Sequence, residues 1–174
     1  MTEIILARHG ETDWNSGSRV QGHTDIPLNA AGVDQARALA EQLAGEPLTA
    51  VFSSDLSRAL DTARVVADIH GLEVTVDPRL REKNFGTWEG LTDVEIAERY
   101  PDARRGHWGD GETTEQVATR VLSMLDEIRD LHPTGPVLVV SHGGPLRAAL
   151  AALAIEHGPI ANCATFRVEY GRGA

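Results

Sequence analysis

The sequence predicts an α/β fold: a three-layer α/β/α sandwich around a mostly parallel central sheet. Two observations carry this prediction. Short apolar runs typical of buried strands alternate along the chain with segments whose apolar residues recur at helical spacing. Such alternation favours a parallel sheet with helices on both faces. The 174 residues fit one domain, spanning 1–174, that is large enough to bury a substantial core.

Five short segments are predicted to be strands of this sheet. The segment 3–7 is a near-continuous apolar run, and 136–140 is the clearest buried strand. Apolar residues at successive positions indicate a strand that is covered on both faces. The complete set comprises 3–7, 49–53, 73–76, 136–140 and 165–169.

Capping residues indicate where the helices begin. Asn29 is expected to cap a helix over 30–44, and Thr113 with Gln116 fits a capping box at the start of another helix. Proline is favoured in the first turn of a helix, which suits Pro145. The remaining helices are expected from about Asp55, over 92–99 and from Pro145 to about Ile155, while 78–91 is expected to be a long functional loop.

The charge balance restricts the classes of partner. Sixteen Lys and Arg against 26 Asp and Glu give a net charge of −10. A chain this acidic is poorly suited to nucleic acid or to an anionic membrane surface, because a basic face supplies most of the affinity for such partners. An anionic ligand would need a local cationic pocket. We therefore expect a small-molecule partner, no nucleic acid and no membrane.

Cysteine usage and hydropathy favour a cytoplasmic protein. Cys163 is the only cysteine, so the chain forms no internal disulfide and no zinc site built from several thiolates. We expect Cys163 to have a packing role. The first residues lack a basic segment and a cleavage site typical of a signal peptide. The longest apolar run, 148–155, is far shorter than the roughly 20 residues of a membrane span.

Basic side chains follow several of the predicted strands, and we expect them to converge. The carboxyl ends of parallel strands meet at one edge of a sheet, where ligands bind. Arginine matches phosphate oxygens bidentately, and histidine near neutral pH can act as a nucleophile or as a donor. Glycines at a helix start add backbone N–H groups and the favourable helix dipole. The residues concerned are Arg8, His9, Arg58, His142, Gly143 and Gly144.

These residues together indicate a phosphate-binding site. Phosphoryl transfer requires one further group. An acid must protonate the leaving oxygen. The loop 78–91 contains two glutamates, Glu82 and Glu89, and residue chemistry alone does not choose between them. No Walker-type glycine-rich loop is present, which argues against a nucleoside triphosphate ligand.

Six motifs occur between residue 4 and about residue 150, and together they resemble the histidine phosphatase superfamily, the fold of cofactor-dependent phosphoglycerate mutase. The Gln21-Gly22-His23 motif is more similar to the phosphatase branch of this family than to its mutase branch. The motifs are Arg8-His9-Gly10-Glu11-Thr12 with Trp14-Asn15; Gln21-Gly22-His23-Thr24-Asp25; Ser53-Ser54-Asp55-Leu56 with Arg58; Leu80 and Glu82 with Phe85-Gly86 and Trp88-Glu89-Gly90; Gly111-Glu112-Thr113; and Val140-Ser141-His142-Gly143-Gly144.

The resemblance implies a role for each matching residue. His9 matches the nucleophile that becomes phosphohistidine, and Glu82 matches the proton donor that later activates water. Glu89 matches a structural residue. Arginines and histidines supply the positive charge, so the mechanism needs no metal and no cofactor. Catalytic roles thus fall to His9, Glu82 and His142, and substrate binding to Arg8, Asn15, Arg58 and Gly143.

The function predicted from the resemblance is that of a metal-independent phosphomonoesterase acting on small phosphate esters. The segment 92–112 is shorter than in the mutases of the family, which should leave the pocket open to water. Three alternatives remain: a cofactor-dependent phosphoglycerate mutase, a phosphohistidine-removing phosphoprotein phosphatase, and a non-catalytic phosphate-binding module. The physiological substrate, the oligomeric state (monomer or homodimer) and substrate contacts by His23, Arg104 or Arg105 stay open.

Overall fold

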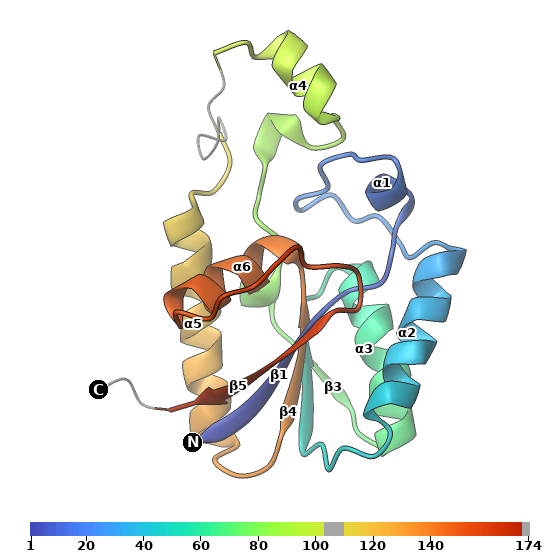
Figure 1. Ribbon diagram of the computed structural model, residues 1–174, viewed down its shortest axis with the longest axis vertical. Helices are drawn as coiled ribbons and strands as arrows, with labels where there is room; N and C mark the ends of the chain where they lie inside the picture. The colour runs from blue at the N-terminus through green and yellow to red at the C-terminus, as the bar shows by residue number, and fades with distance from the viewer. Residues whose placement is uncertain (103–109, 172–174) are drawn as a thin grey trace.

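The structure, a computed structural model, describes residues 1–102 and 110–171, and it is an α/β/α sandwich (Figure 1). Over the described residues, five strands form one sheet in the order β3-β2-β4-β1-β5. All neighbouring pairs are parallel except β1 with β5, which is antiparallel. The predicted mostly parallel sheet is therefore confirmed. The strands are β1 (Thr2–Arg8), β2 (Ala50–Ser53), β3 (Val74–Val76), β4 (Val137–Ser141) and β5 (Thr165–Tyr170).

Helices cover both faces of this sheet. Side chains on β1 alternate between the faces, as the pleat of a strand requires. Ile5 and Ala7 pack with α2 and α3, whereas Ile4 and Leu6 pack with α5 and α6. The helices are α1 (Asp13–Ser16), α2 (Ala30–Leu43), α3 (Ser57–His70), α4 (Asp93–Arg99), α5 (Thr114–Leu131) and α6 (Gly143–Ala152), with short 3₁₀ turns at Pro78–Leu80 and Gly86–Trp88.

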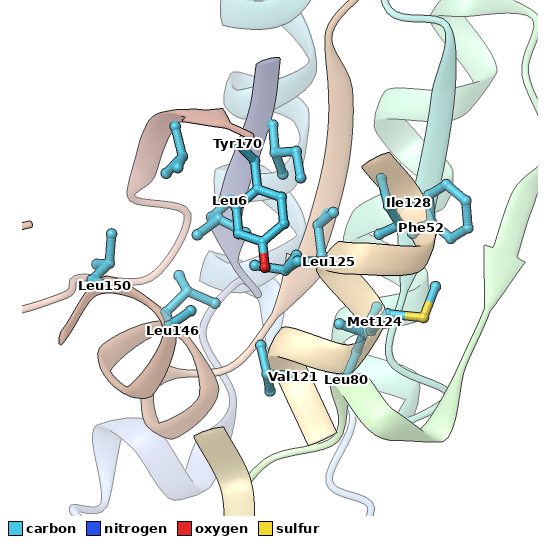
Figure 2. Close-up of a cluster of buried hydrophobic side chains, with 14 of the residues drawn as sticks. Leu6, Phe52, Leu80, Val121, Met124, Leu125, Ile128, Leu146, Leu150 and Tyr170 are labelled. Carbon is cyan, nitrogen blue, oxygen red and sulfur yellow. The ribbon is translucent and has the colours of Figure 1, made fainter. Parts of the chain in front are cut away.

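The larger hydrophobic core lies between the sheet and the pair α5 and α6. Figure 2 shows its centre, where Leu6 of β1 and Tyr170 of β5 meet Leu125 of α5 and Leu146 of α6. Leu80, from the 3₁₀ turn that opens the long loop, is fully buried in the same cluster. The core thus fixes one end of the predicted functional loop against α5.

Most predicted elements are present, with shifted boundaries. Asn29 caps α2 through the N–H of Gly32, and Thr113 with Gln116 forms the predicted capping box. The helix expected from about Asp55 begins at Ser57. The last helix begins at Gly143 and ends at Ala152, so Pro145 lies within its first turn.

Strand order determines where a ligand can bind. The chain leaves β1 toward β2 on one side, and β4 is followed on the other side by β5, so β1 and β4 flank a switch in strand order. The crevice at such a point, beyond the carboxyl ends of the strands, is the usual ligand site of an open α/β sheet. In Figure 1, α1 and α4 lie beyond this edge of the sheet.

Candidate functional site

The nucleophile candidate lies at the carboxyl end of β1, beside the end of β4. Arg8 is opposite Ser141 in the parallel ladder, and the His9 N–H donates to the carbonyl of Ser141 at 3.0 Å. The residue after Ser141 is His142, and the centroids of the His9 and His142 rings are 5.0 Å apart. The two histidines predicted to converge, 133 positions apart in the numbering, are thus neighbours.

The protonation state of His9 is specified by its surroundings. Nδ1 of His9 is 2.6 Å from the carbonyl oxygen of Gly10. A carbonyl can only accept, so the proton of a neutral ring sits on Nδ1 and the lone pair is on Nε2. Burial, followed by the charges of Arg58 and Arg8, holds the pKa of His9 well below its usual value of about 6.5. His9 is therefore a neutral ring with a nucleophilic Nε2 at physiological pH.

His142 is neutral for similar reasons. It is fully buried, and burial, then the charge of Arg58, holds its pKa well below the usual range. Neither of its ring nitrogens has a hydrogen-bond partner among the described residues. A neutral imidazole carries one N–H and one lone pair, so His142 can still donate one hydrogen bond to a phosphoryl oxygen.

These two neutral histidines should make the fold less stable in acid. Below about pH 6.5 the unfolded chain binds protons at both positions, whereas the folded chain does not until its lower pKa values are reached. The free energy of unfolding therefore falls as the pH decreases through this window, by up to about 1.4 kcal/mol per pH unit for each histidine.

Between pH 6.5 and pH 5.5, the free energy of unfolding should fall less in the variant His142→Gln than in the wild type. The difference should be about 1 kcal/mol, because the variant has one titrating histidine fewer. Urea unfolding at the two pH values measures this difference. Equal losses in the variant and the wild type would contradict a depressed pKa at His142.

Two arginines surround the histidines. Arg58 lies on the first turn of α3 and is 0% exposed. Its Nη1 and Nη2 atoms donate to the carbonyls of Thr24 and Gly22, at 2.9 and 2.8 Å. Arg8 donates through Nη1 to the carbonyl of Ile160 at 2.6 Å. Burial lowers the pKa of both guanidinium groups, and the negative charge of Glu82 opposes that effect.

Four of the five buried side-chain nitrogen atoms that lack a hydrogen-bond partner in the described chain lie at this site. They include Nε of Arg8, Nε of Arg58 and both ring nitrogens of His142, and one further atom lies elsewhere, on His70. A buried polar group without a partner costs about 1–3 kcal/mol. Their concentration at one place, where no carboxylate of residues 1–102 or 110–171 bonds to either arginine, matches a site for a small tetrahedral anion.

The predicted acid stands over the start of α6. Oε1 of Glu82 accepts hydrogen bonds from the backbone N–H of Gly144 at 3.0 Å and from that of Lys83 at 2.8 Å. A Cβ atom at Gly144 would collide with the Glu82 carboxylate. Glycine at this position is thus what allows the acid to approach the helix start. The N–H of Gly143 has no acceptor among the described residues and stays available to an anion.

Glu89 has the structural role implied by the resemblance. Its carboxylate accepts from the N–H of His23, from the N–H and hydroxyl of Thr24, and from the N–H of Phe85. It therefore joins the acid loop to the 22–24 segment, whose carbonyls in turn hold Arg58. A carboxylate that already accepts four hydrogen bonds is poorly suited to shuttle a proton.

Arg120 holds the acid loop, and the sequence reasoning missed it. From the middle of α5, its guanidinium donates to the carbonyls of Arg79, Arg81 and Glu82 at 2.6–2.8 Å. It also pairs with the carboxylate of Glu112 at 2.8 Å. An arginine on an amphipathic helix resembles an ordinary surface charge in the sequence, so no local signal distinguishes it.

The remaining predicted residues have the following positions. Asn15 lies on α1 and is joined to His9 by the amide of Asn162, which donates to both. His23 places Nε2 2.8 Å from the carbonyl of Glu82, which makes it a neighbour of the acid loop. Burial raises the pKa of the Cys163 thiol to about 11, which leaves it protonated and favours a packing role. Arg104 and Arg105 lie outside the described residues.

Comparisons with known proteins agree with this geometry. The family described as histidine phosphatase superfamily (branch 1) matches residues 4–174. The chain is 39% identical over 175 residues to glucosyl-3-phosphoglycerate phosphatase of Mycolicibacterium vanbaalenii, covering 90% of this chain and 77% of that protein. It is 42% identical over 159 residues to a metal-independent phosphoserine phosphatase of Arabidopsis thaliana, covering 85% and 67%. Relatives named probable phosphoglycerate mutase also match.

The fold also matches solved structures over most of their length. YhfR of Bacillus stearothermophilus superimposes with a TM-score of 0.92 and 32% identity, covering 99% of this chain and 93% of that one. Within residues 1–102 and 110–171, no helix is both long and apolar enough to cross a membrane. The same ranges contain no group of three or more His, Cys, Asp or Glu that could hold a metal ion.

Proposed function

The chain belongs to branch 1 of the histidine phosphatase superfamily, and we propose that it is a metal-independent phosphomonoesterase that hydrolyses small phosphate esters through a phosphohistidine intermediate on His9. One observation carries the proposal. A neutral histidine, with its lone pair on Nε2, lies among buried cationic and N–H donors that lack partners. That arrangement suits attack on the phosphorus of an anionic ester better than simple anion binding.

The first step transfers the phosphoryl group to the histidine. Nε2 of His9 attacks phosphorus, the P–N bond forms, and the bond from phosphorus to the ester oxygen breaks. Glu82, in its protonated form, gives its proton to that oxygen, so the leaving group departs as an alcohol. Arg8, Arg58 and His142 donate hydrogen bonds to the equatorial oxygens, which stabilises charge in the transition state.

The second step returns the enzyme to its starting state. A water molecule attacks phosphorus, the P–N bond breaks, and the Glu82 carboxylate accepts the proton that the water loses. Inorganic phosphate leaves, and His9 is again neutral with its lone pair on Nε2. The hydrogen bond from Nδ1 of His9 to Gly10 holds the ring in one orientation through both steps.

A cavity beside the acid loop suits the leaving group. Its volume is about 720 Å³, and it runs between the first turns of α5 and the length of α6. Phe85, Val117 and Ala148 line it, together with the two cations Lys83 and Arg147. A space of this size fits an ester with a small body, which supports small phosphorylated molecules as substrates.

The names of the relatives support the same class of reaction. A glucosyl-3-phosphoglycerate phosphatase and a metal-independent phosphoserine phosphatase both release phosphate from a small phosphomonoester. We propose further that residues 1–174 form a single domain and that the protein acts in the cytoplasm, since its one cysteine fits a reducing compartment.

A panel of phosphomonoesters, assayed for phosphate release with and without EDTA, tests this function. The panel would include phosphoserine, 3-phosphoglycerate, a sugar phosphate and p-nitrophenyl phosphate. We expect turnover of at least one ester, with rates unchanged by EDTA, because cationic side chains supply the charge that a metal would otherwise bring. Activity that requires added divalent metal would refute the mechanism.

The mutase is the second candidate, because relatives named probable phosphoglycerate mutase match the chain. A mutase of this type returns the phosphoryl group from His9 to a phosphoglycerate instead of to water, and it needs priming by a bisphosphate. Incubation with 3-phosphoglycerate and a trace of 2,3-bisphosphoglycerate separates the two. Interconversion of phosphoglycerates that outruns phosphate release would replace the hydrolase proposal.

A further inference from the structure

Asn162 joins two residues of the site from a distant part of the chain. It lies just before β5, 153 positions from His9, yet its Nδ2 atom donates to the carbonyl of His9 at 3.0 Å. The same Nδ2 donates to Oδ1 of Asn15 at 3.2 Å. An amide nitrogen carries two hydrogens, so both are used at the site.

The amide of Asn15 is thereby held in one orientation. Its Oδ1 accepts from the backbone N–H of Thr12 at 3.1 Å and from the Thr12 hydroxyl at 3.2 Å, as well as from Asn162. The two N–H donors require an oxygen, so the opposite side of the amide must be the nitrogen. Among the described residues no acceptor lies within hydrogen-bond distance of the Asn15 Nδ2. Two further N–H groups therefore remain for an anion beside His9.

We propose that Asn162 is a positioning residue for phosphoryl transfer: it holds the Asn15 amide with its nitrogen toward the phosphoryl group and restrains the backbone of the nucleophile. This inference rests on the proposed function. Asn162 does not itself touch the phosphoryl group, because both of its N–H groups are already engaged. Its effect passes mainly through Asn15, with a smaller part through the His9 carbonyl.

The geometry indicates how large the effect should be. Without Asn162, only the N–H and the hydroxyl of Thr12, both on one neighbouring residue, would hold the Asn15 side chain, which could then rotate away from the phosphoryl position. Misplacement of a catalytic contact by about 1 Å can cost roughly 100-fold in rate. We expect Asn162→Ala to lower kcat/KM for p-nitrophenyl phosphate by about 10- to 100-fold, and to raise the inhibition constant of inorganic phosphate.

A double-mutant cycle tests the route through Asn15. The variants are Asn162→Ala, Asn15→Ala and the pair, each assayed for kcat/KM and for inhibition by inorganic phosphate. If Asn162 acts mainly through Asn15, its loss should cost less than about 3-fold once Asn15 is absent. Asn162→Ser, which keeps one donor, should fall between the wild type and the alanine variant, and it serves if Asn162→Ala does not fold.

Asn29→Ala is the matched control for lost stability. Asn29 also makes two side-chain hydrogen bonds, to the N–H of Gly32 and to Glu11, but it caps α2 outside the site. We expect this variant to melt at a lower temperature with kcat/KM within about 3-fold of the wild type, since loss of a cap costs about 1 kcal/mol of stability.

Two results would overturn the inference. One is wild-type kcat/KM in Asn162→Ala. The other is an equal loss from that substitution in the presence and absence of Asn15, which would show that Asn162 acts independently of it. Both are distinguishable from failure of the proposed function, which would appear as no hydrolysis by the wild-type protein.

Discussion

Replacing His9 with alanine should reduce the turnover of every phosphomonoester substrate by at least about 10⁴-fold, because removal of a nucleophile from a covalent mechanism has effects of this size or larger. The neighbouring His142, whose ring centroid is 5.0 Å from that of His9, donates to the phosphoryl oxygens in the proposed mechanism and does not replace the nucleophile. Arg8, Arg58 and His142 would remain and would still stabilise charge on the phosphoryl group, so a small residual rate above that of water is expected.

Rapid quenching under alkaline conditions detects the intermediate directly. With a ³²P-labelled ester, the wild type should carry acid-labile label on the protein, and His9→Ala should carry none. His132→Ala is the matched control, since His132 lies beside Thr2 at the start of β1, at the opposite end of that strand from His9. Labelled protein in the His9→Ala variant would contradict the assignment of the nucleophile.

Replacing Glu82 with glutamine should have an effect that depends on the leaving group. The amide can still accept the N–H groups of Gly144 and Lys83, so the loop should keep its position. It cannot donate a proton to the ester oxygen as an acid does. For an alkyl phosphate, whose alkoxide is a poor leaving group, we expect the rate of the first step to fall by about 10²- to 10⁴-fold. For p-nitrophenyl phosphate, whose phenolate leaves without help, that step should fall far less.

Single-turnover rates for the two esters measure this contrast, and Glu89→Gln provides its control. Glu89 joins the acid loop to the 22–24 segment, so its loss should slow both esters by a similar factor. An equal loss for both esters in Glu82→Gln would remove Glu82 from the role of acid and leave it a structural one.

Patterns within short segments predicted the layers of the fold and the centre of the site. Apolar runs identified the strands, and the rule that ligands bind beyond the carboxyl ends of parallel strands brought Arg8, His9 and His142 together. Both predictions depend on residues that are close together in the sequence, and such local patterns can be read from one sequence. The same rule also predicted Arg58 at this edge, because α3 begins just after β2.

Patterns within short segments could not predict the contacts between segments that are far apart in the sequence. Glu82 and Glu89 have the same side chain in the same loop, and they differ in which distant N–H groups they meet. Asn162 and Arg120 act on residues 153 and 38–41 positions away, and neither carries a local pattern that marks it. The resemblance to a family supplied the role of Glu82, but it offered no role for Asn162.

The fully buried Arg58 has a consequence for the stability of the folded protein when no ligand is bound. Among the described residues its guanidinium donates hydrogen bonds only to neutral carbonyls, and the nearby carboxylates of Glu82, Asp25 and Glu89 offset the effect of burial without bonding to it. A buried charge of this kind costs several kcal/mol unless an opposite charge approaches it. In the proposed mechanism, substrate and inorganic phosphate both bring that charge, so we expect each to stabilise the folded chain by an amount that grows with the logarithm of its concentration relative to its Kd. We therefore expect the product to be a stabilising ligand as well, so that the free energy of unfolding rises with the phosphate concentration around the protein.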